Sequence, residues 1–341
     1  MAEEHNQNED WRERTAEPAA VRSLYRAGLL GPAARDRALA LLRPPRAWWR
    51  WADRLLLLLG AALVLAGVVF FFAYNWERLS RFLKFGLLQT GIVICVAGAH
   101  WTQDRELPSK VFLLAASVLV GPLLAVYGQA YQTGADAFEL FVAWAALILP
   151  WVVAARFAGL WVFWLGLVNV ASILYWVQVL EPNRVILHFE VLFIFLALVN
   201  AWALGGGEAG RERGYDWLAG RWPRWLLLAA VLFYLTAPTL TYVVEPGLRE
   251  EPGLLAAGLW IVAAGAAWYF YRRRYRDLPA LSLAVLSACT VLLTLVGKML
   301  FQVADETWTY LFFGLIILGV MSLAVYLLRR AGRRMAEKRD G

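Results

Sequence analysis

Residues 308–328 read WTYLFFGLIILGVMSLAVYLL, and no charged side chain interrupts them. An α-helix rises about 1.5 Å per residue, so about 20 apolar residues cross the roughly 30 Å hydrocarbon core of a bilayer. The next six residues, RRAGRR, place four arginines directly after the apolar run. An apolar run of this length that ends on arginines is typical of a transmembrane helix whose end faces the cytoplasm.

Further apolar runs of similar length precede this one. The predicted spans cover residues 55–74, 83–101, 111–128, 137–154, 158–179, 186–204, 225–244, 253–271, 278–297 and 308–328. The composition agrees, because 61% of the 341 residues are hydrophobic and 17% are charged, whereas soluble domains average about half and a quarter. We therefore predict an all-α polytopic transmembrane bundle of about ten spans, five within 55–180 and five within 181–328.

The positive charges are distributed unevenly between the two sides of the predicted membrane. With the N-terminus inside, 27 of the 33 Lys and Arg residues fall on the inner side, including the loop at 272–276 and the tail at 329–341. The positive-inside rule then predicts that both termini lie in the cytoplasm. The net charge of +7 is explained by topology and by attraction to anionic lipid, so we predict no nucleic-acid partner.

The segment before the first span is expected to be cytoplasmic. Residues 1–17 are polar and without periodicity, which predicts a disordered tail. Residues 18–45 predict a short pair of helices separated at Gly28 to Gly31, and such a pair is too small to fold alone. We expect it to dock on a partner, on itself or on the membrane surface. Residues 46–54 interleave tryptophans with arginines, as expected of an anchor at the headgroup level.

The loop between the third and fourth predicted spans has no Lys or Arg and gathers polar side chains. These are Tyr127, Gln129, Tyr131, Gln132, Thr133, Asp136 and Glu139. One interpretation is structural: Asp136 caps the fourth span, Glu139 closes a capping box, and the tyrosines anchor at the interface. The other is functional: these side chains line an outward-facing pocket or contact a periplasmic partner.

Four polar residues within or at the ends of predicted spans are candidates for a role in the membrane, where such residues are uncommon. Asn169 and Asn200 are expected to form hydrogen bonds between helices. Glu190 lies at the start of the sixth span, where its carboxylate is expected to reach the interface, with a proton-linked role as the alternative. Lys298 ends the ninth span and is expected to snorkel outward.

The motifs of common catalytic sites are missing from the sequence. There is no H-E-x-x-H, no Walker motif and no aspartate dyad, and three histidines and two cysteines form no recognisable ligand cluster. We predict no catalytic residues, no metal and no cofactor, and expect that the protein is not an enzyme.

The first half of the chain resembles a family of bacterial predicted membrane proteins, domain-of-unknown-function family 2157. The resemblance spans about residues 20–180 and rests on Y-Q-T-G-A-D at 131–136, E-L-F at 139–141, Trp144, Pro150-Trp151, and the A-G-L-L at 27–30 that precedes the tryptophans at 48–51. It implies a bacterial inner-membrane protein that assembles with another polytopic membrane protein and a small periplasmic protein. It implies no catalytic residue.

Three hypotheses for function follow. The first is a non-catalytic subunit of a membrane and periplasmic assembly, in contact with the lipid bilayer and its partners. The second is a transporter or flippase for a weakly charged or lipid-like substrate. The third and weakest is a sensor that relays an event at the outer loop to the N-terminal helices.

Overall fold

A computed structural model describes residues 18–42, 78–180, 189–218, 220–245, 250–303 and 306–337, together with Leu56, Leu59 and Leu63. Its elements are α2 (Pro18–Arg26), α3 (Pro32–Leu42), α5 (Arg81–Trp101), α6 (Glu106–Tyr131), α7 (Ala137–Ala155), α8 (Ala158–Tyr175), η2 (Trp176–Leu180), α9 (Phe189–Glu212), η3 (Asp216–Leu218), α10 (Trp222–Val244), α11 (Glu250–Arg273), α12 (Leu278–Val303) and α13 (Glu306–Glu337). These described stretches contain no strand, which confirms the predicted all-α class. The chain divides into two compact units, Met1–Ser80 and Arg81–Gly341.

The first unit contains the predicted helical pair. Helices α2 and α3 pack on each other, and the turn between them uses Gly28 at a φ of 74°, which glycine adopts without steric cost. The guanidinium of Arg35 lies 4.5 Å from the centre of the Tyr25 ring. The predicted tail at 1–17, the anchor at 46–54 and nearly all of the span at 55–74 lie outside the described residues.

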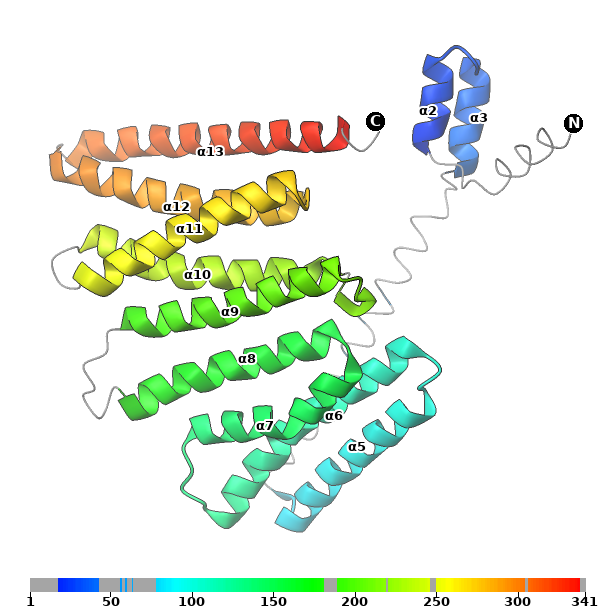
Figure 1. Ribbon diagram of the computed structural model, residues 1–341, viewed down its shortest axis with the longest axis vertical. Helices are drawn as coiled ribbons and strands as arrows, with labels where there is room; N and C mark the ends of the chain where they lie inside the picture. The colour runs from blue at the N-terminus through cyan, green and yellow to red at the C-terminus, as the bar shows by residue number, and fades with distance from the viewer. Residues whose placement is uncertain are drawn as a thin grey trace, which may run out of the picture. The chain divides into compact units, whose positions relative to one another are not determined.

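The second unit is a bundle of the long helices α5 to α13. Within the part of the chain that the structure describes, nine helices are long and apolar enough to cross a membrane, one for each predicted span from the second to the tenth. Figure 1 shows α8, α9, α10, α12 and α13 stacked in that order, with α11 crossing in front of α10 and α12, which also contact each other. The last helix continues past the predicted limit of 328 to Glu337, so its basic end is helical.

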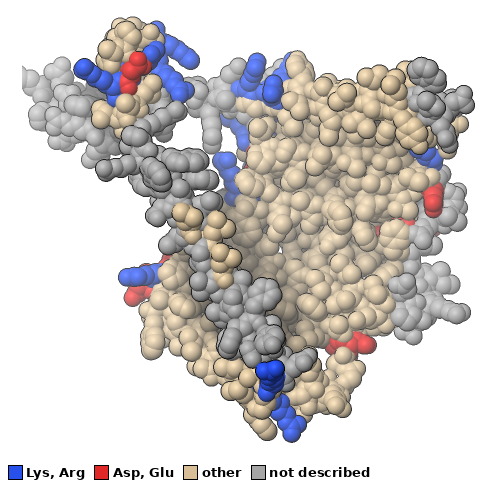
Figure 2. Space-filling model, turned by 180° about the vertical axis from the view of Figure 1, so that it is seen from behind, with Lys and Arg blue, Asp and Glu red and all other residues tan. Residues whose placement is uncertain are grey.

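The surface of the bundle matches this assignment. Figure 2 shows a wide area of uncharged side chains, with charged groups mainly along its margins. One end of the bundle, where α9 ends and α10 begins, gathers arginines from helix ends and loops, and we name it the arginine-rich end. These arginines include Arg211, Arg213, Arg221, Arg224, Arg272, Arg273 and Arg274.

Two tryptophans join α6, α7 and α8. The indole N–H of Trp144 on α7 donates to the carbonyl of Ser117 on α6 at 2.7 Å, and that of Trp164 on α8 donates to the carbonyl of Ala145 at 3.0 Å. Around them, Val120, Ile148, Val152, Leu160 and Leu167 form a buried apolar cluster. The short connection between α7 and α8 turns at Arg156 with a φ of 45°, which confirms two separate helices there.

A second set of contacts joins α10, α11 and α12. The hydroxyl of Ser287 on α12 accepts from the indole of Trp260 on α11 and lies 2.8 Å from the hydroxyl of Thr236 on α10. These polar groups satisfy one another away from water, where an unmatched group would be costly. Leu228, Leu232, Ala267, Ala280 and Ala284 pack nearby as an apolar cluster.

Helices α8 and α9 form the seam between these two groups of helices. They meet over fewer residues than α7 shares with α8 or α9 with α10. Asn200 on α9 donates to the side-chain oxygen of Asn169 on α8 at 2.8 Å. A cavity of about 640 Å³ opens between α7, α8, η2 and α9 on one side of this bond, and one of about 300 Å³ opens between α8, α9, η3 and α10 at the arginine-rich end.

Candidate functional sites

The predicted outer-loop residues lie together where α6 ends and α7 begins. All seven side chains are exposed. The rings of Tyr127 and Tyr131, one helical turn apart, have centroids 4.8 Å apart. The backbone reverses through Gln132 and Gly134, both at positive φ. The loop is therefore an accessible polar surface, and its side chains are not used in the core of the bundle.

The predicted capping box is wrong. Asp136 occupies the N-cap position of α7, but its side chain makes no capping hydrogen bond. Instead, the backbone N–H of Phe138 donates to the side-chain oxygen of Gln178 at 3.0 Å. Gln178 reaches this amide from η2, the π-helical turn that extends α8. The carboxylate of Asp136 thus stays exposed. Gln178, forty positions after Phe138, caps α7 in its place.

This arrangement predicts different losses of stability for two substitutions. Gln178→Ala should lower the free energy of unfolding by about 1 kcal/mol, because it removes the cap of α7. Asp136→Ala should change it by less than about 0.5 kcal/mol, as expected for an exposed residue without such a bond. Equilibrium unfolding in detergent micelles compares the two. A larger loss for Asp136→Ala than for Gln178→Ala would contradict this assignment of the cap.

The predictions for the four polar residues of the spans have three different outcomes. Asn169 and Asn200 bond to each other, which confirms the predicted interhelical role; each also donates to the carbonyl four residues before it. Glu190 does not reach the interface, because it is 1% exposed in the first turn of α9. That prediction is wrong: the neighbouring elements cover this helix end. Lys298 is half-buried and does not end its helix, because α12 continues to Val303.

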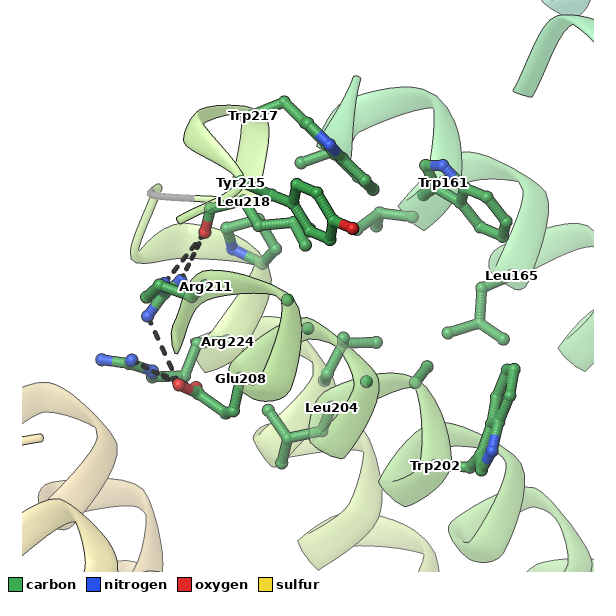
Figure 3. Close-up of a pocket in the computed structure, with 18 of the residues that line it drawn as sticks. Trp161, Leu165, Trp202, Leu204, Glu208, Arg211, Tyr215, Trp217, Leu218 and Arg224 are labelled. Carbon is green, nitrogen blue, oxygen red and sulfur yellow. Dashed lines mark hydrogen bonds and ion pairs between the residues drawn. The ribbon is translucent and has the colours of Figure 1, made fainter. Parts of the chain in front are cut away.

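The cavity at the arginine-rich end is a site that the sequence did not indicate. Its walls come from α8, α9, η3 and α10, and Figure 3 shows side chains from these elements turned toward one space. Most of the lining is apolar: Trp161, Leu165, Trp202, Leu204, Trp217 and Leu218 take part. Arg211, Arg213, Glu208 and Arg224 complete it. The result is an apolar cavity with charged groups at one side.

Glycines of α9 shape this cavity. A Cβ added at Gly205, Gly206 or Gly207 would meet no atom within 4 Å, whereas at Gly210 it would lie 2.5 Å from a methyl carbon of Leu218. Gly210 therefore lets η3 lie directly on α9. Arg211 holds the same segment, donating to the carbonyls of Leu218 at 2.8 Å and Gly220 at 2.6 Å.

A buried ionic cluster lies beside this cavity. Arg224 is 5% exposed, and its guanidinium donates to Glu208 of α9 and, at 2.7 Å, to Asp277 just before α12. The indole of Trp225 donates to the other oxygen of Asp277 at 3.0 Å, which also accepts from the backbone N–H of Ala280. One arginine thus joins α9, α10 and α12. Two carboxylates pair with its single positive charge, and Arg211 lies 3.6 Å from Glu208 and supplies a second one, so the buried charges have opposite partners.

The exposed side of the same end carries a weaker set of contacts. Glu212 accepts from Arg274 and from the hydroxyl of Tyr275, each at 2.9 Å. Burial first, and then this hydrogen bond, raise the pKa of the Tyr275 hydroxyl, so it remains a donor at neutral pH. Together with the buried cluster, these contacts fix the α11–α12 loop against the end of α9.

The sequence analysis explained the arginines of this end by membrane topology alone. Glu208, Arg224 and Asp277 are far apart in the chain, with 16 residues from Glu208 to Arg224 and 53 from Arg224 to Asp277. The signal that could have indicated them is that Glu208 and Asp277 are acidic residues at the ends of apolar helices on the basic side. Among the described residues, no group of three His, Cys, Asp or Glu side chains is placed to hold a metal ion.

Comparison with known proteins supports the resemblance found in the loop. Residues 22–161 match the family described as predicted membrane protein (DUF2157). No curated protein matches the chain, and no solved structure does. The matched range holds α3, the second half of α2 and every residue of the outer loop, while α9 to α13 lie beyond it. This is a polytopic helical membrane protein whose residues 22–161 carry the sequence of the DUF2157 family of predicted membrane proteins.

Proposed function

We propose that this protein is a non-catalytic subunit of an assembly in the bacterial inner membrane, and that its outer loop binds a periplasmic protein. The observation that carries the proposal is the loop between α6 and α7, where seven polar side chains are exposed together. Asp136 and Glu139 are its charged members. A partner that matches this surface presents hydrogen-bond donors and Lys or Arg side chains.

The loop has two properties that suit a docking surface. Its end at α7 is anchored, because the side chain of Gln178 accepts from the backbone N–H of Phe138, and Gly134 turns the chain at a positive φ. It also sits at the opposite end of α6 and α7 from Arg105 and Arg156. By the positive-inside rule the arginine-rich end faces the cytoplasm, so the loop faces the periplasm and both termini are cytoplasmic.

A photoreactive residue at position 132 tests the proposal in native membranes. We expect reproducible adducts to one protein, identified by mass spectrometry. Asp136→Arg should reduce the yield at least tenfold, because a like charge then faces the basic partner. Asp104→Arg is the matched control, an exposed carboxylate at the other end of α6, and should leave the yield unchanged.

A second probe position separates the protein partner from lipid. Leu318 lies on α13 and is 65% exposed, so a photoreactive residue there should give mainly lipid adducts. The subunit proposal is wrong if the probe at position 132 gives only lipid or small-molecule adducts like those from position 318.

That outcome would favour a transporter or flippase, for which the seam provides a specific observation. Two cavities lie along α8 and α9, one on each side of the Asn169–Asn200 bond. A lipid-like substrate needs few buried charges along its path, and charged side chains line only the cavity at the arginine-rich end. Movement of a substrate would require the bond to open.

A further inference from the structure

The cavity at the arginine-rich end has mainly apolar walls, which suit an apolar chain. It measures about 300 Å³, within the range of small-molecule sites. Tryptophans line it from three elements: Trp161 on α8, Trp202 on α9 and Trp217 in η3. Trp202 is 80% exposed, so the cavity borders the surface of the bundle that faces lipid and can be entered sideways.

Two glycines of α9 leave space in the wall of the cavity that no described side chain fills. A glycine inside a helix costs about 0.5–1 kcal/mol relative to alanine. Close helix packing often explains such a glycine in membranes, and it explains Gly121 and Gly210, where an added Cβ would collide with a neighbour. It does not explain Gly206 and Gly207, which line the cavity with open space above them.

The charges around the cavity select the headgroup of the ligand. Glu208 and Asp277 pair with Arg224, while Arg211 donates to backbone carbonyls and lies 3.6 Å from Glu208. Arg213 is exposed and lines the cavity, so it supplies positive charge at the rim. Basic pockets between transmembrane helices bind anionic lipid headgroups, and a guanidinium matches the geometry of a phosphate.

We propose that this cavity binds an anionic phospholipid, with an acyl chain between α8 and α9 against Gly206 and Gly207 and the phosphate at Arg213. A zwitterionic lipid offers the same chain but carries a compensating positive charge, so it binds more weakly. The site lies at the opposite end of the bundle from the outer loop. Loss of lipid binding and loss of partner binding are therefore separate results.

Native mass spectrometry of the full chain in detergent, with phosphatidylglycerol or phosphatidylcholine added, tests the proposal. We expect the protein to retain phosphatidylglycerol at least tenfold more tightly. Gly206→Leu fills the cavity and should weaken phosphatidylglycerol binding at least tenfold. Gly205→Leu is the matched control: it also has open space at its Cβ but does not line the cavity, and should bind as the unmodified chain does.

Arg213→Gln tests the headgroup with a substitution at an exposed side chain. It should remove the preference for phosphatidylglycerol and leave the binding of phosphatidylcholine unchanged, even if the leucine variants do not fold. The proposal is overturned if the unmodified chain binds both lipids equally. It is also overturned if Gly206→Leu, eluting as a single folded species, retains phosphatidylglycerol as Gly205→Leu does, or if Arg213→Gln keeps the preference.

Discussion

Arg224→Met should lower the free energy of unfolding by about 3–5 kcal/mol, the usual cost of removing one partner from a buried ion pair. Glu208 and Asp277 would lose the guanidinium that joins them, while both remain at the ends of membrane helices. Arg211 reaches Glu208 only at 3.6 Å, and the indole of Trp225 continues to bond Asp277. Neither contact replaces the lost charge, so the junction of α9, α10 and α12 should open first.

Two further variants show whether the loss comes from unpaired charge. Arg221→Met removes an exposed arginine one turn from Arg224 and should change the free energy of unfolding by less than about 0.5 kcal/mol. The triple variant Glu208→Gln, Arg224→Met, Asp277→Asn removes all three charges and should recover to within about 1 kcal/mol of the starting protein. Unfolding in mixed micelles, followed by helical circular dichroism, measures each. A triple variant as unstable as Arg224→Met would assign the loss to packing.

Gly121→Ala should lower the free energy of unfolding by about 1–3 kcal/mol or more, as overpacked cores do. The new methyl would lie 2.3 to 2.6 Å from three ring atoms of Trp144. The ring cannot simply move away, because its N–H donates to Ser117 at 2.7 Å and its other side meets Phe163 with centroids 5.6 Å apart. Helices α6 and α7 would separate, and the outer loop between them would shift.

The control for this substitution is another helical glycine. Gly166 on α8 has no atom within 4 Å of an added Cβ, so Gly166→Ala should leave stability unchanged or raise it by up to about 1 kcal/mol. Combining Gly121→Ala with Trp144→Leu removes the colliding ring atoms, so the double variant should be less destabilised than the two single losses summed. Additive losses in unfolding experiments would contradict the proposed collision.

Local sequence predicted the helices well, because length and hydropathy are properties of one segment at a time. Each predicted span from the second to the tenth corresponds to a described helix, including the pair separated only by Arg156 and Phe157. The pair of Asn169 and Asn200 was also predictable in kind, since amides inside lipid must find polar partners. To predict that Asn169 and Asn200 bond to each other, one must know that α8 and α9 are neighbours.

The candidate site was predictable only in part. The outer loop stood out because its polar residues lie close together in the chain. Asp136 was assigned a local role by proximity, and Gln178 took that role because the end of α8 comes beside the start of α7. Glu190 was placed at an interface by its position near a helix end, yet the packing of the bundle buries it.

What the sequence determined by itself is the class of protein: a helical membrane bundle, its spans and its charge asymmetry, because each follows from the transfer of one apolar segment into lipid. What only the tertiary structure decided is which distant residues meet. Arg224 joins Glu208 to Asp277, and the glycines of α9 border a cavity instead of a helix contact. The physical reason is that hydropathy records whether a segment enters the membrane, whereas helix neighbours depend on the fit of side chains across the bundle.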